Sequence, residues 1–514
     1  MSKTHLSVLE SSASHYPSSP VFRIPHIDSQ SSQLHWRSVT YRQFYNDVLL
    51  FARYWSRTLA QVRIPQRSVI GLWIGGYTYT DILHIYGLSR AGYIPQLFSL
   101  RLPNPDVIFE LLAKANARAL IHDQTFENVL GECPVPTYLA QQADRIDANG
   151  HPLPSLLDVE PSDLAFLFHT NSVVSKSYQV AVPRDSSRQD VTVWMGSMCH
   201  IGQTFMLLGS LQHGTCTIQP TTISFSSEEL LDMIHHCGLN RLNQFAAFLA
   251  MQLRNARNDT KLLSALANLD EVLYSGMPLP REEQEWALRN HINLRNLFGS
   301  TECGATLISV GGCGPDANLL RPLDGVSYRF VPIDSDKAEA EHHSTARMLE
   351  FVVSAESGDC PDISLRHADG HFHTGDLFQE VTEGRYVFRG RDDDWIKSEN
   401  SLRCDTKAVE DNVRATCGGL VADCIVVGTG RPSPVLFVEP AVDMDENRLK
   451  KEIIRKTRPF HARRYLHERI TSPNMIVVVS RNTLPRTATK GNIRRKAVEE
   501  AYKTELDRIY GLIR

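Results

Sequence analysis

Residues 68–74, Ser-Val-Ile-Gly-Leu-Trp-Ile, form a short apolar run of the kind that makes a buried strand. A helix is predicted before this run, because apolar residues recur at helical spacing over 40–55 and Thr40 is a suitable N-cap. The alternation continues with a helix over 80–91, a strand over 93–95, a helix over 105–116 and a strand over 118–121. Strands and helices that alternate in this way predict parallel sheets with crossover helices, and therefore an α/β fold.

The composition is that of a soluble globular protein. A chain of 514 residues has room for roughly three structural units of about 150 residues each. Its 42% hydrophobic and 22% charged residues exclude a disordered or collagen-like chain. No transmembrane span and no signal peptide are expected, because no long apolar run occurs. The ten cysteines form no C-x-x-C pair, so a disulfide scaffold or zinc site is not predicted, and a cytoplasmic location is expected.

The charge is unevenly distributed along the chain. Residues 441–514 contain 18 Lys and Arg against 9 Asp and Glu, which gives +9, so the rest sums to −13 for a total of −4. Solvated helix faces explain such a basic region, and attraction of small phosphorylated ligands is the alternative. Nucleic acid is not an expected partner, because the basic residues are not interleaved with stacking aromatics.

A change in composition near 390–394 indicates a domain boundary. The stretch Gly-Arg-Asp-Asp-Asp is polar and follows a strand-like segment at 386–388. A smaller α/β pattern comes after it, with strands predicted over 422–427, 435–438 and 475–479 and a helix over 447–458. We therefore predict a large N-terminal domain of parallel-rich sheets with crossover helices (1–390), a hinge (391–395) and a small C-terminal α/β domain (396–514).

Six short segments occur in a fixed order along the chain. They are YSGMPL at 274–279, NLFGSTE at 296–302, RPLDGV at 321–326, HTGDL at 373–377, GRDDDWIK at 390–397, and LPRT at 484–487 with KGNIRRK at 490–496. Each is weak alone, but their common order makes coincidence improbable. Together they resemble the motifs of adenylate-forming enzymes, which comprise acyl-CoA synthetases, peptide-synthetase adenylation domains and luciferases. The later motifs are similar to those of stand-alone or reductase-linked fungal members.

The resemblance implies ATP-dependent activation of an organic carboxylic acid as an acyl-adenylate, followed by acyl transfer. ATP or AMP and Mg²⁺ are the implied cofactors, and CoA is one implied acceptor. Only about twenty residues follow Ile493, so a carrier protein or other acceptor is expected in trans. Aromatic, fatty and small polyketide acids all remain open as substrates.

The resemblance also implies roles for individual residues. Glu302 is the implied Mg²⁺ ligand, because a hard cation prefers carboxylate oxygen. Thr301 is implied to offer a hydroxyl to the α-phosphate. Asp376 is implied to accept the ribose hydroxyls, and Arg391 to add a donor from the hinge. Lys490 is the mobile cation that bridges the substrate carboxylate and the α-phosphate, where negative charge crowds.

Further positions complete the implied site. His200, within Met-Cys-His-Ile-Gly at 198–202, borders the implied acyl pocket, where the segment 243–248 is expected to supply a helical wall. Asp393 is the implied pivot of a domain rotation between the two half-reactions. The remaining residues implied to bind the nucleotide are Ser275, Gly276, Met277, Asn296, Phe298 and Gly299.

Structural roles remain alternatives for several of these residues. Thr301 and Glu302 could cap a helix, and Asp376 could be a turn aspartate. Arg391 with Asp393 could form a solvated ion pair. Lys490 could be a surface lysine, because it precedes Gly491 where the commoner order is Gly-Lys. His200 could equally be a core histidine.

One motif departs from the family pattern. The phosphate-binding loop normally reads T-S-G-S-T-G-x-P-K after a strand, whereas a predicted strand at 164–168 is followed here by His-Thr-Asn-Ser-Val-Val-Ser-Lys-Ser-Tyr at 169–178. Glycines would let several amide N–H groups face one phosphate, but β-branched Val173 and Val174 disfavour those conformations. Hydroxyls of Thr170, Ser172 and Ser175, with Lys176 displaced in register, are the remaining phosphate donors. Slow adenylation is therefore expected.

Two functions follow from these observations. The retained Thr301, Glu302, Asp376 and Arg391 favour an adenylate-forming ligase. The altered loop favours a degenerate relative without ATP chemistry, whose inherited pocket binds a small molecule or supports another reaction.

Overall fold

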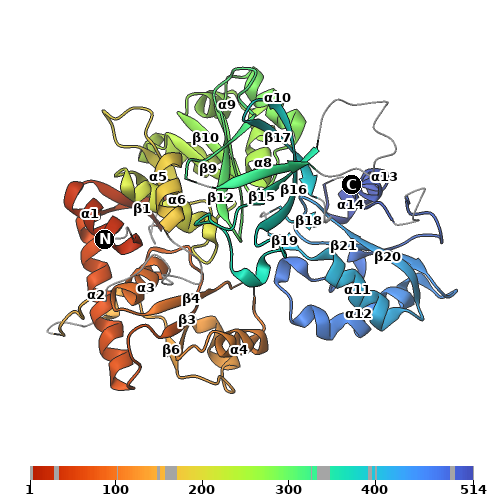
Figure 1. The fold of residues 1–514 in the computed structure, drawn as a ribbon, viewed down its shortest axis with the longest axis horizontal. Coiled ribbons are helices and arrows are strands. Elements are labelled where there is room, and N and C mark those ends of the chain that lie inside the picture. The colour runs from red at the N-terminus through yellow and green to blue at the C-terminus, as the bar shows by residue number, and fades with distance from the viewer. Residues whose placement is uncertain are drawn as a thin grey trace. The chain divides into compact units, whose positions relative to one another are not determined.

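The computed structural model describes residues 4–27, 34–100, 102–146, 151–156, 171–325, 327–332, 348–391, 396–399, 402–486 and 493–512. The chain forms two compact units (Figure 1). The larger unit comprises 1–100, 109–244 and 248–390, and the smaller comprises 391–514 with 101–108 and 245–247. The predicted α/β class, with a large N-terminal part and a smaller C-terminal part, is confirmed; the boundaries at 390 and 395 stay a prediction.

The stretch around residues 68–74 forms the centre of a four-stranded parallel sheet. Its order is β4 (Ile94–Phe98), β3 (Val69–Trp73), β5 (Ala119–His122), β6 (Thr137–Leu139). The helices of this region are α2 (Tyr41–Gln61), α3 (Tyr79–Arg90) and α4 (Pro105–Lys114). The side chain of Thr40 accepts from the N–H of Gln43, so the predicted N-cap is confirmed. Figure 1 shows α2 and α3 beside β3 and β4.

A second sheet, with thirteen strands among the described residues, carries most of the motifs. Its order is β14 (Tyr328–Pro332), β15 (Met348–Val353), β16 (Phe372–Thr382), β17 (Arg385–Arg391), β13 (Leu320–Pro322), β12 (Gly304–Ser309), β11 (Leu294–Ser300), β10 (Glu271–Ser275), β9 (Arg241–Phe245), β7 (Val191–Val193), β8 (Cys216–Ile218), β1 (Pro20–Ile27), β2 (Leu34–Thr40). The pairs β10–β11, β7–β8, β7–β9 and β1–β8 are parallel. The other helices before residue 300 are α1 (His5–His15), α5 (Asn171–Val180), α6 (Ile201–Gln212), α7 (Ser227–Cys237), α8 (Ala246–Ala256), α9 (Thr260–Ala267) and α10 (Arg281–Arg289).

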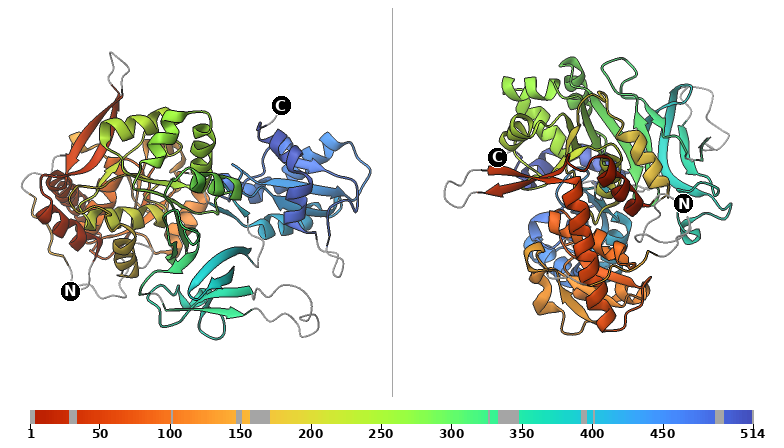
Figure 2. Two further views of the ribbon diagram at one scale, coloured as in Figure 1. Left: turned by 90° about the horizontal axis from the view of Figure 1, so that it is seen from above. Right: turned by 90° about the vertical axis from the view of Figure 1, so that its left-hand side faces the viewer.

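Two details of the predicted large domain are wrong. Helices do not alternate with strands throughout, because β11 to β17 are joined without an α-helix in the described residues. The pairs β11–β12, β12–β13, β13–β17, β14–β15 and β15–β16 are antiparallel. These strands are green to teal in Figure 2. The expected helical wall over 243–248 is split, since β9 ends at Phe245 and α8 begins at Ala246. Short apolar runs alone do not distinguish parallel from antiparallel pairing.

The smaller unit is built on a three-stranded sheet. In it β20 (Val421–Val427) pairs antiparallel with β21 (Val435–Pro440), which pairs parallel with β22 (Ile476–Val478). Buried apolar side chains form a cluster on each face of this sheet. The unit also contains β18 (Ile396–Lys397), β19 (Arg403–Cys404), α11 (Thr406–Cys417), α12 (Glu446–Ala462), α13 (Arg495–Ala501) and α14 (Lys503–Ile509). The predicted strands and helix of this region are confirmed.

Two expectations from composition agree with the structure. All ten cysteines are free thiols, as the absence of paired spacings predicted. Within the described ranges, none of the helices combines the length and apolar character that a bilayer span requires.

Candidate functional site

The residues Thr301 and Glu302 lie in the turn that joins β11 to β12. Thr301 is exposed, Glu302 is partly buried and Cys303 is buried. The N–H of Cys303 donates to the Ser300 hydroxyl at 3.2 Å, which closes the turn. This turn is a strand connection and not a helix terminus, so the helix-cap alternative for Thr301 and Glu302 is wrong.

Glycine is required directly before this turn. A Cβ on Gly299 would meet the backbone carbonyl of Gly304 across the hairpin, and the Cα of Ala305 at 2.8 Å. Gly304 has a φ of +66°, a conformation that L side chains rarely adopt. The glycine of the NLFGSTE motif is therefore explained by close approach of the two strands.

The segment at 274–279 reaches the same edge of the sheet. Because β10 and β11 are parallel, their carboxyl ends lie together. The Ser275 hydroxyl donates to the Leu297 carbonyl at 2.7 Å, and Gly276 turns the chain away with a φ of +89°. The N–H of Asn296 donates to the Ser309 hydroxyl at 2.8 Å, which ties β11 to β12. The predicted nucleotide-binding residues of these two motifs thus emerge from adjacent strand ends, with Met277 following Gly276.

Asp376 lies on β16 and is 3% exposed. Its N–H donates to the Thr374 hydroxyl at 3.0 Å, and that hydroxyl donates to the Phe351 carbonyl at 2.7 Å. Asp376 therefore belongs to a strand, and the turn-aspartate alternative is wrong. Thr374, Asp376 and Phe378 are the buried positions in this part of β16.

An aromatic cluster joins the two motif-bearing strands. The ring of Phe298 on β11 lies 5.2 Å from the rings of both Phe378 and Phe388. Cys303 and Phe378 belong to the same buried cluster. The contact of Phe298 with Phe378 therefore packs the hairpin that carries Thr301 and Glu302 against the strand that carries Asp376, although β17 and β13 lie between them in the sheet.

Sequence reasoning missed a charged clamp next to Asp376. His373 contacts Glu350 at 2.9 Å through Nδ1 and Asp369 at 3.0 Å through Nε2. Glu350 also accepts from the N–H of Gly375 at 3.1 Å. Partial burial disfavours the imidazolium, but the hydrogen bonds to Asp369 and Glu350 outweigh it, so the pKa of His373 is raised. The clamp fixes the backbone that presents Asp376.

His200 is the N-cap of α6. Its Nδ1 accepts from the N–H of Gly202 at 3.1 Å, and its side chain is partly buried. The side chain is therefore neither fully in the core nor fully exposed. Its predicted place beside an acyl pocket stays a prediction.

Three predicted residues fall on parts of the chain that are not described. These residues are Thr170, Asp393 and Lys490, and the predicted strand at 164–168 also lies outside the described residues. Arg391 is described only by its backbone, at the end of β17. Arg486 and Ile493, which lie on either side of Lys490 in the sequence, pair as an antiparallel bridge. Arg486 also contacts Asp423 at 2.8 Å and Glu439 at 2.7 Å.

The prediction that Lys176 serves as a displaced phosphate ligand is wrong. Residues 171–180 form helix α5, on which Val173 and Val174 are buried and Ser175 is exposed. The Lys176 side chain is 1% exposed and pairs with Asp359 at 2.7 Å. Burial lowers the pKa of Lys176, and the neighbouring Asp359 carboxylate only partly offsets this. The helical spacing of Val173, Val174, Ser177 and Val180 is the signal that could have indicated a helix here.

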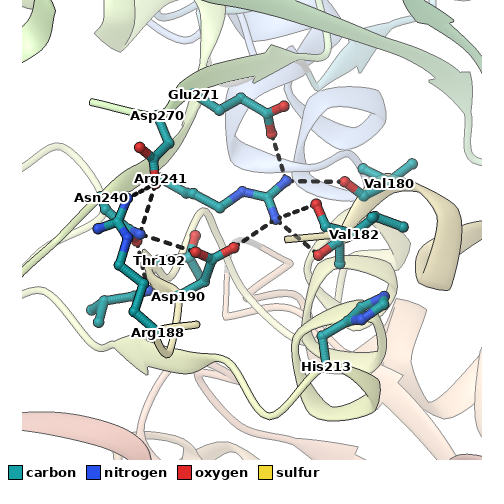
Figure 3. A network of polar contacts seen from close by, with 12 residues as sticks. Val180, Val182, Arg188, Asp190, Thr192, His213, Asn240, Arg241, Asp270 and Glu271 are labelled. Atoms are coloured by element: carbon teal, nitrogen blue, oxygen red, sulfur yellow. Dashed lines mark hydrogen bonds and ion pairs between the residues drawn. The ribbon is translucent and has the colours of Figure 1, made fainter. Parts of the chain in front are cut away.

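A buried arginine network holds the end of this helix. Arg241 donates to the carbonyls of Val180 at 3.1 Å and Ala181 at 2.8 Å, and pairs with Asp190 at 3.2 Å and Glu271 at 2.8 Å. Figure 3 shows Arg241 extended between these groups. Burial disfavours ionised Glu271, but its arginine partners outweigh it and the pKa of this carboxyl is lowered. Helix α5 is thus a firmly anchored structural element.

The described residues offer few ligands for a metal. No group of three or more His, Cys, Asp or Glu side chains in the described part of the chain has an arrangement that could hold an ion. Mg²⁺ in nucleotide sites is usually bound by one or two carboxylates together with phosphates. The single carboxylate of Glu302 in the β11–β12 turn fits that mode of binding. The described residues do not provide a metal site made of protein ligands alone.

Comparison with known proteins identifies the family. Residues 9–327 match the family model described as AMP-binding enzyme, and 393–513 match AMP-binding enzyme C-terminal domain. The chain is 33% identical to the AMP-binding domain-containing enzyme iboA of Amanita muscaria, with 94% of this chain and 98% of that protein covered. It is 24% identical to L-proline–[L-prolyl-carrier protein] ligase of Pseudomonas fluorescens, with 55% and 60% covered.

A solved structure shows the same fold. The o-succinylbenzoate CoA synthetase from Bacillus subtilis, bound to a product analogue, superposes with a TM-score of 0.66 at 16% identity, with 96% of this chain and 98% of that chain covered. The fold, the two family models and the 33% identical relative agree with one another. The chain belongs to the AMP-binding enzymes of the adenylate-forming superfamily.

Proposed function

We propose that this protein is a ligase that joins an organic carboxylic acid to AMP, using ATP and Mg²⁺, and then transfers the acyl group to an acceptor. The observation that carries the proposal is the aromatic cluster of Phe298, Phe378 and Phe388, which brings the Thr301–Glu302 turn and the Asp376 strand together. A hydroxyl, a carboxylate for a cation and a carboxylate for ribose are then supplied from strands of one sheet that the aromatic cluster connects.

Electrostatics assigns the roles of these side chains. A carboxylate that attacks the α-phosphate adds negative charge to a group that is already anionic. Glu302 would hold the Mg²⁺ that offsets this charge, and the exposed Thr301 hydroxyl would donate to the α-phosphate. Asp376 would accept from the ribose hydroxyls, and Ser275 to Met277 with Asn296, Phe298 and Gly299 would line the nucleotide site.

The smaller domain would supply the mobile groups. In this proposal 391–395 is the hinge, Arg391 donates to the nucleotide and Lys490 bridges the substrate carboxylate and the α-phosphate. The bridge between Arg486 and Ile493 supports it, because the residues on either side of Lys490 are held in the small unit. Asp393 would be the pivot, so Asp393→Pro should spare adenylation and impair acyl transfer. Equal loss of both half-reactions would contradict this role.

The acceptor is proposed to be CoA or a carrier protein in trans. The names of two similar proteins support these choices, since one is a CoA synthetase and the other a carrier-protein ligase. His200, at the N-terminus of α6, would border the acyl group.

Helix α5 supports a second candidate function. With Lys176 buried and Val173 and Val174 in the core, residues 173–180 form an anchored helix and do not provide a glycine-rich phosphate cradle. A non-adenylating relative that uses the same fold for small-molecule binding or another reaction is the alternative.

Acid-dependent exchange of pyrophosphate into ATP separates the two functions. Pools of aromatic, fatty and polyketide acids should give exchange with the wild-type protein, and Lys490→Ala should lower it at least a hundredfold with unchanged thermal unfolding. An exposed lysine of the small domain, changed as Lys451→Ala, is the matched control and should retain exchange. AMP binding without exchange in any pool would favour the second function.

A further inference from the structure

The ammonium group of Lys176 contacts the strand that leaves the Thr301–Cys303 turn. Its Nζ donates to the Ala305 carbonyl at 2.5 Å and to the Cys303 carbonyl at 3.3 Å. The same Nζ lies 2.7 Å from an oxygen of Asp359, and both side chains are 1% exposed. Three acceptors from two separate segments therefore share one buried cation.

We propose that Lys176 is a positioning residue that holds the Thr301–Cys303 turn, so that Glu302 is presented for Mg²⁺ binding. This inference rests on the proposed function. Helix α5 would then take the place of a loop that contacts the phosphates directly. Its lysine would act on the phosphate site indirectly, by holding the backbone of the turn.

The Lys176 ammonium is a buried charge. An ammonium removed from water is costly unless its protons are satisfied, and here Asp359 and two carbonyls satisfy them. Charge-assisted hydrogen bonds are shorter and stronger than neutral ones. The carbonyls of Cys303 and Ala305 are therefore held in a fixed orientation, and the turn that begins at Thr301 is held with them.

The placement of α5 makes this arrangement rigid. Arg241 donates to the carbonyls of Val180 and Ala181 at the end of the helix. A Cβ on Gly209 of α6 would lie 2.5 Å from the Ser177 carbonyl, so the two helices pack closely. Lys176 projects from a helix that cannot shift easily, which suits a residue that positions another.

The test removes both buried charges together, because removal of one would leave the other uncompensated. The variant is Lys176→Met/Asp359→Leu. The control is Gln179→Met, which removes two hydrogen bonds from the same helix but does not contact the turn. Electron paramagnetic resonance measures Mn²⁺ binding in the presence of ATP, calorimetry measures metal-free AMP binding, and exchange is measured against Mg²⁺ concentration.

The double variant should bind Mn²⁺ about tenfold more weakly and need about tenfold more Mg²⁺ for half-maximal exchange. A tenfold change corresponds to a loss of about 1.4 kcal/mol in the free energy of metal binding, because Glu302 is no longer held in position. Its affinity for metal-free AMP, and all values for Gln179→Met, should change less than twofold. Unchanged Mn²⁺ affinity, or an equal loss of AMP affinity, would overturn the inference. If the double variant does not fold, Lys176→Gln/Asp359→Asn should give about a threefold loss, and no loss overturns the inference.

The same measurements separate this inference from the proposed function. Wild-type protein that binds Mn²⁺ with ATP but exchanges with no acid contradicts the ligase, while a tenfold difference in the double variant still supports the role of Lys176. Wild-type protein that binds no Mn²⁺ with ATP overturns both.

Discussion

Acidification should destabilise the larger unit through His84. The ring is fully buried, accepts from Trp55 Nε1 at 3.0 Å through Nδ1, and lies 3.0 Å from the Gln141 carbonyl through Nε2. Because an indole N–H can only donate, Nδ1 must be the acceptor and Nε2 must carry the proton. A second proton on Nδ1 would face the indole N–H. Burial is the main reason why the pKa of His84 falls from 6.5 to about 4.

The size of the effect follows from that pKa. Between pH 6.5 and 4 the unfolded chain takes up a proton that the folded chain does not, so the free energy of unfolding falls as the pH falls. The loss attributable to His84 should reach about 3 kcal/mol at pH 4. Urea unfolding followed by tryptophan fluorescence at a series of pH values between 7 and 4 measures it.

The variant His84→Gln isolates this contribution from other buried histidines. It should be less stable than the wild type at pH 7, because the Trp55 and Gln141 hydrogen bonds are altered. The free energy of unfolding of the wild type, relative to that of the variant, should then fall by about 3 kcal/mol between pH 7 and pH 4. Parallel loss of stability in both proteins would refute the assigned tautomer and its cost.

Two further substitutions test the site architecture. Gly299→Ala should lower the free energy of unfolding by about 1–3 kcal/mol in a thermal unfolding assay, because the new methyl group meets the backbone of β12. The control is Gly131→Ala, where no atom lies within 4 Å of the new methyl group. It should change the free energy of unfolding by less than about 0.5 kcal/mol. Thr374→Val removes a buried hydroxyl that bonds both Phe351 and Asp376, so it should cost about 2 kcal/mol and weaken AMP binding in calorimetry. Unchanged AMP affinity in a folded Thr374→Val protein would argue against a ribose role for Asp376.

Local pattern was sufficient for much of the fold. The apolar run at 68–74 became β3, and Thr40 became the N-cap of α2, because both depend on residues that are close in sequence. The strands of the small domain were predictable for the same reason. The antiparallel strands from β11 to β17 were not, since pairing direction depends on partners that are far apart in the chain.

The candidate site was predictable only in part. Motif order located Thr301, Glu302 and Asp376, but the aromatic cluster that joins their strands is a tertiary contact with no local pattern. The role of Lys176 was missed because its partners, Asp359 and the Cys303 and Ala305 carbonyls, are more than 120 positions away. Lys176 lies close to the position of the lysine in the family's phosphate-binding loop, and this suggested a phosphate contact. The helical spacing of the neighbouring apolar residues instead indicates a buried position.

The central claim is that a carboxylate oxygen becomes bonded to the α-phosphorus of ATP. An acid that supports exchange, labelled with ¹⁸O in both carboxylate oxygens, is incubated with the protein, ATP, Mg²⁺ and an acceptor, and the AMP is examined by mass spectrometry. Attack on the α-phosphate predicts AMP that carries one ¹⁸O atom. Unlabelled AMP, or label in inorganic phosphate with ADP as the product, would contradict the proposed adenylation.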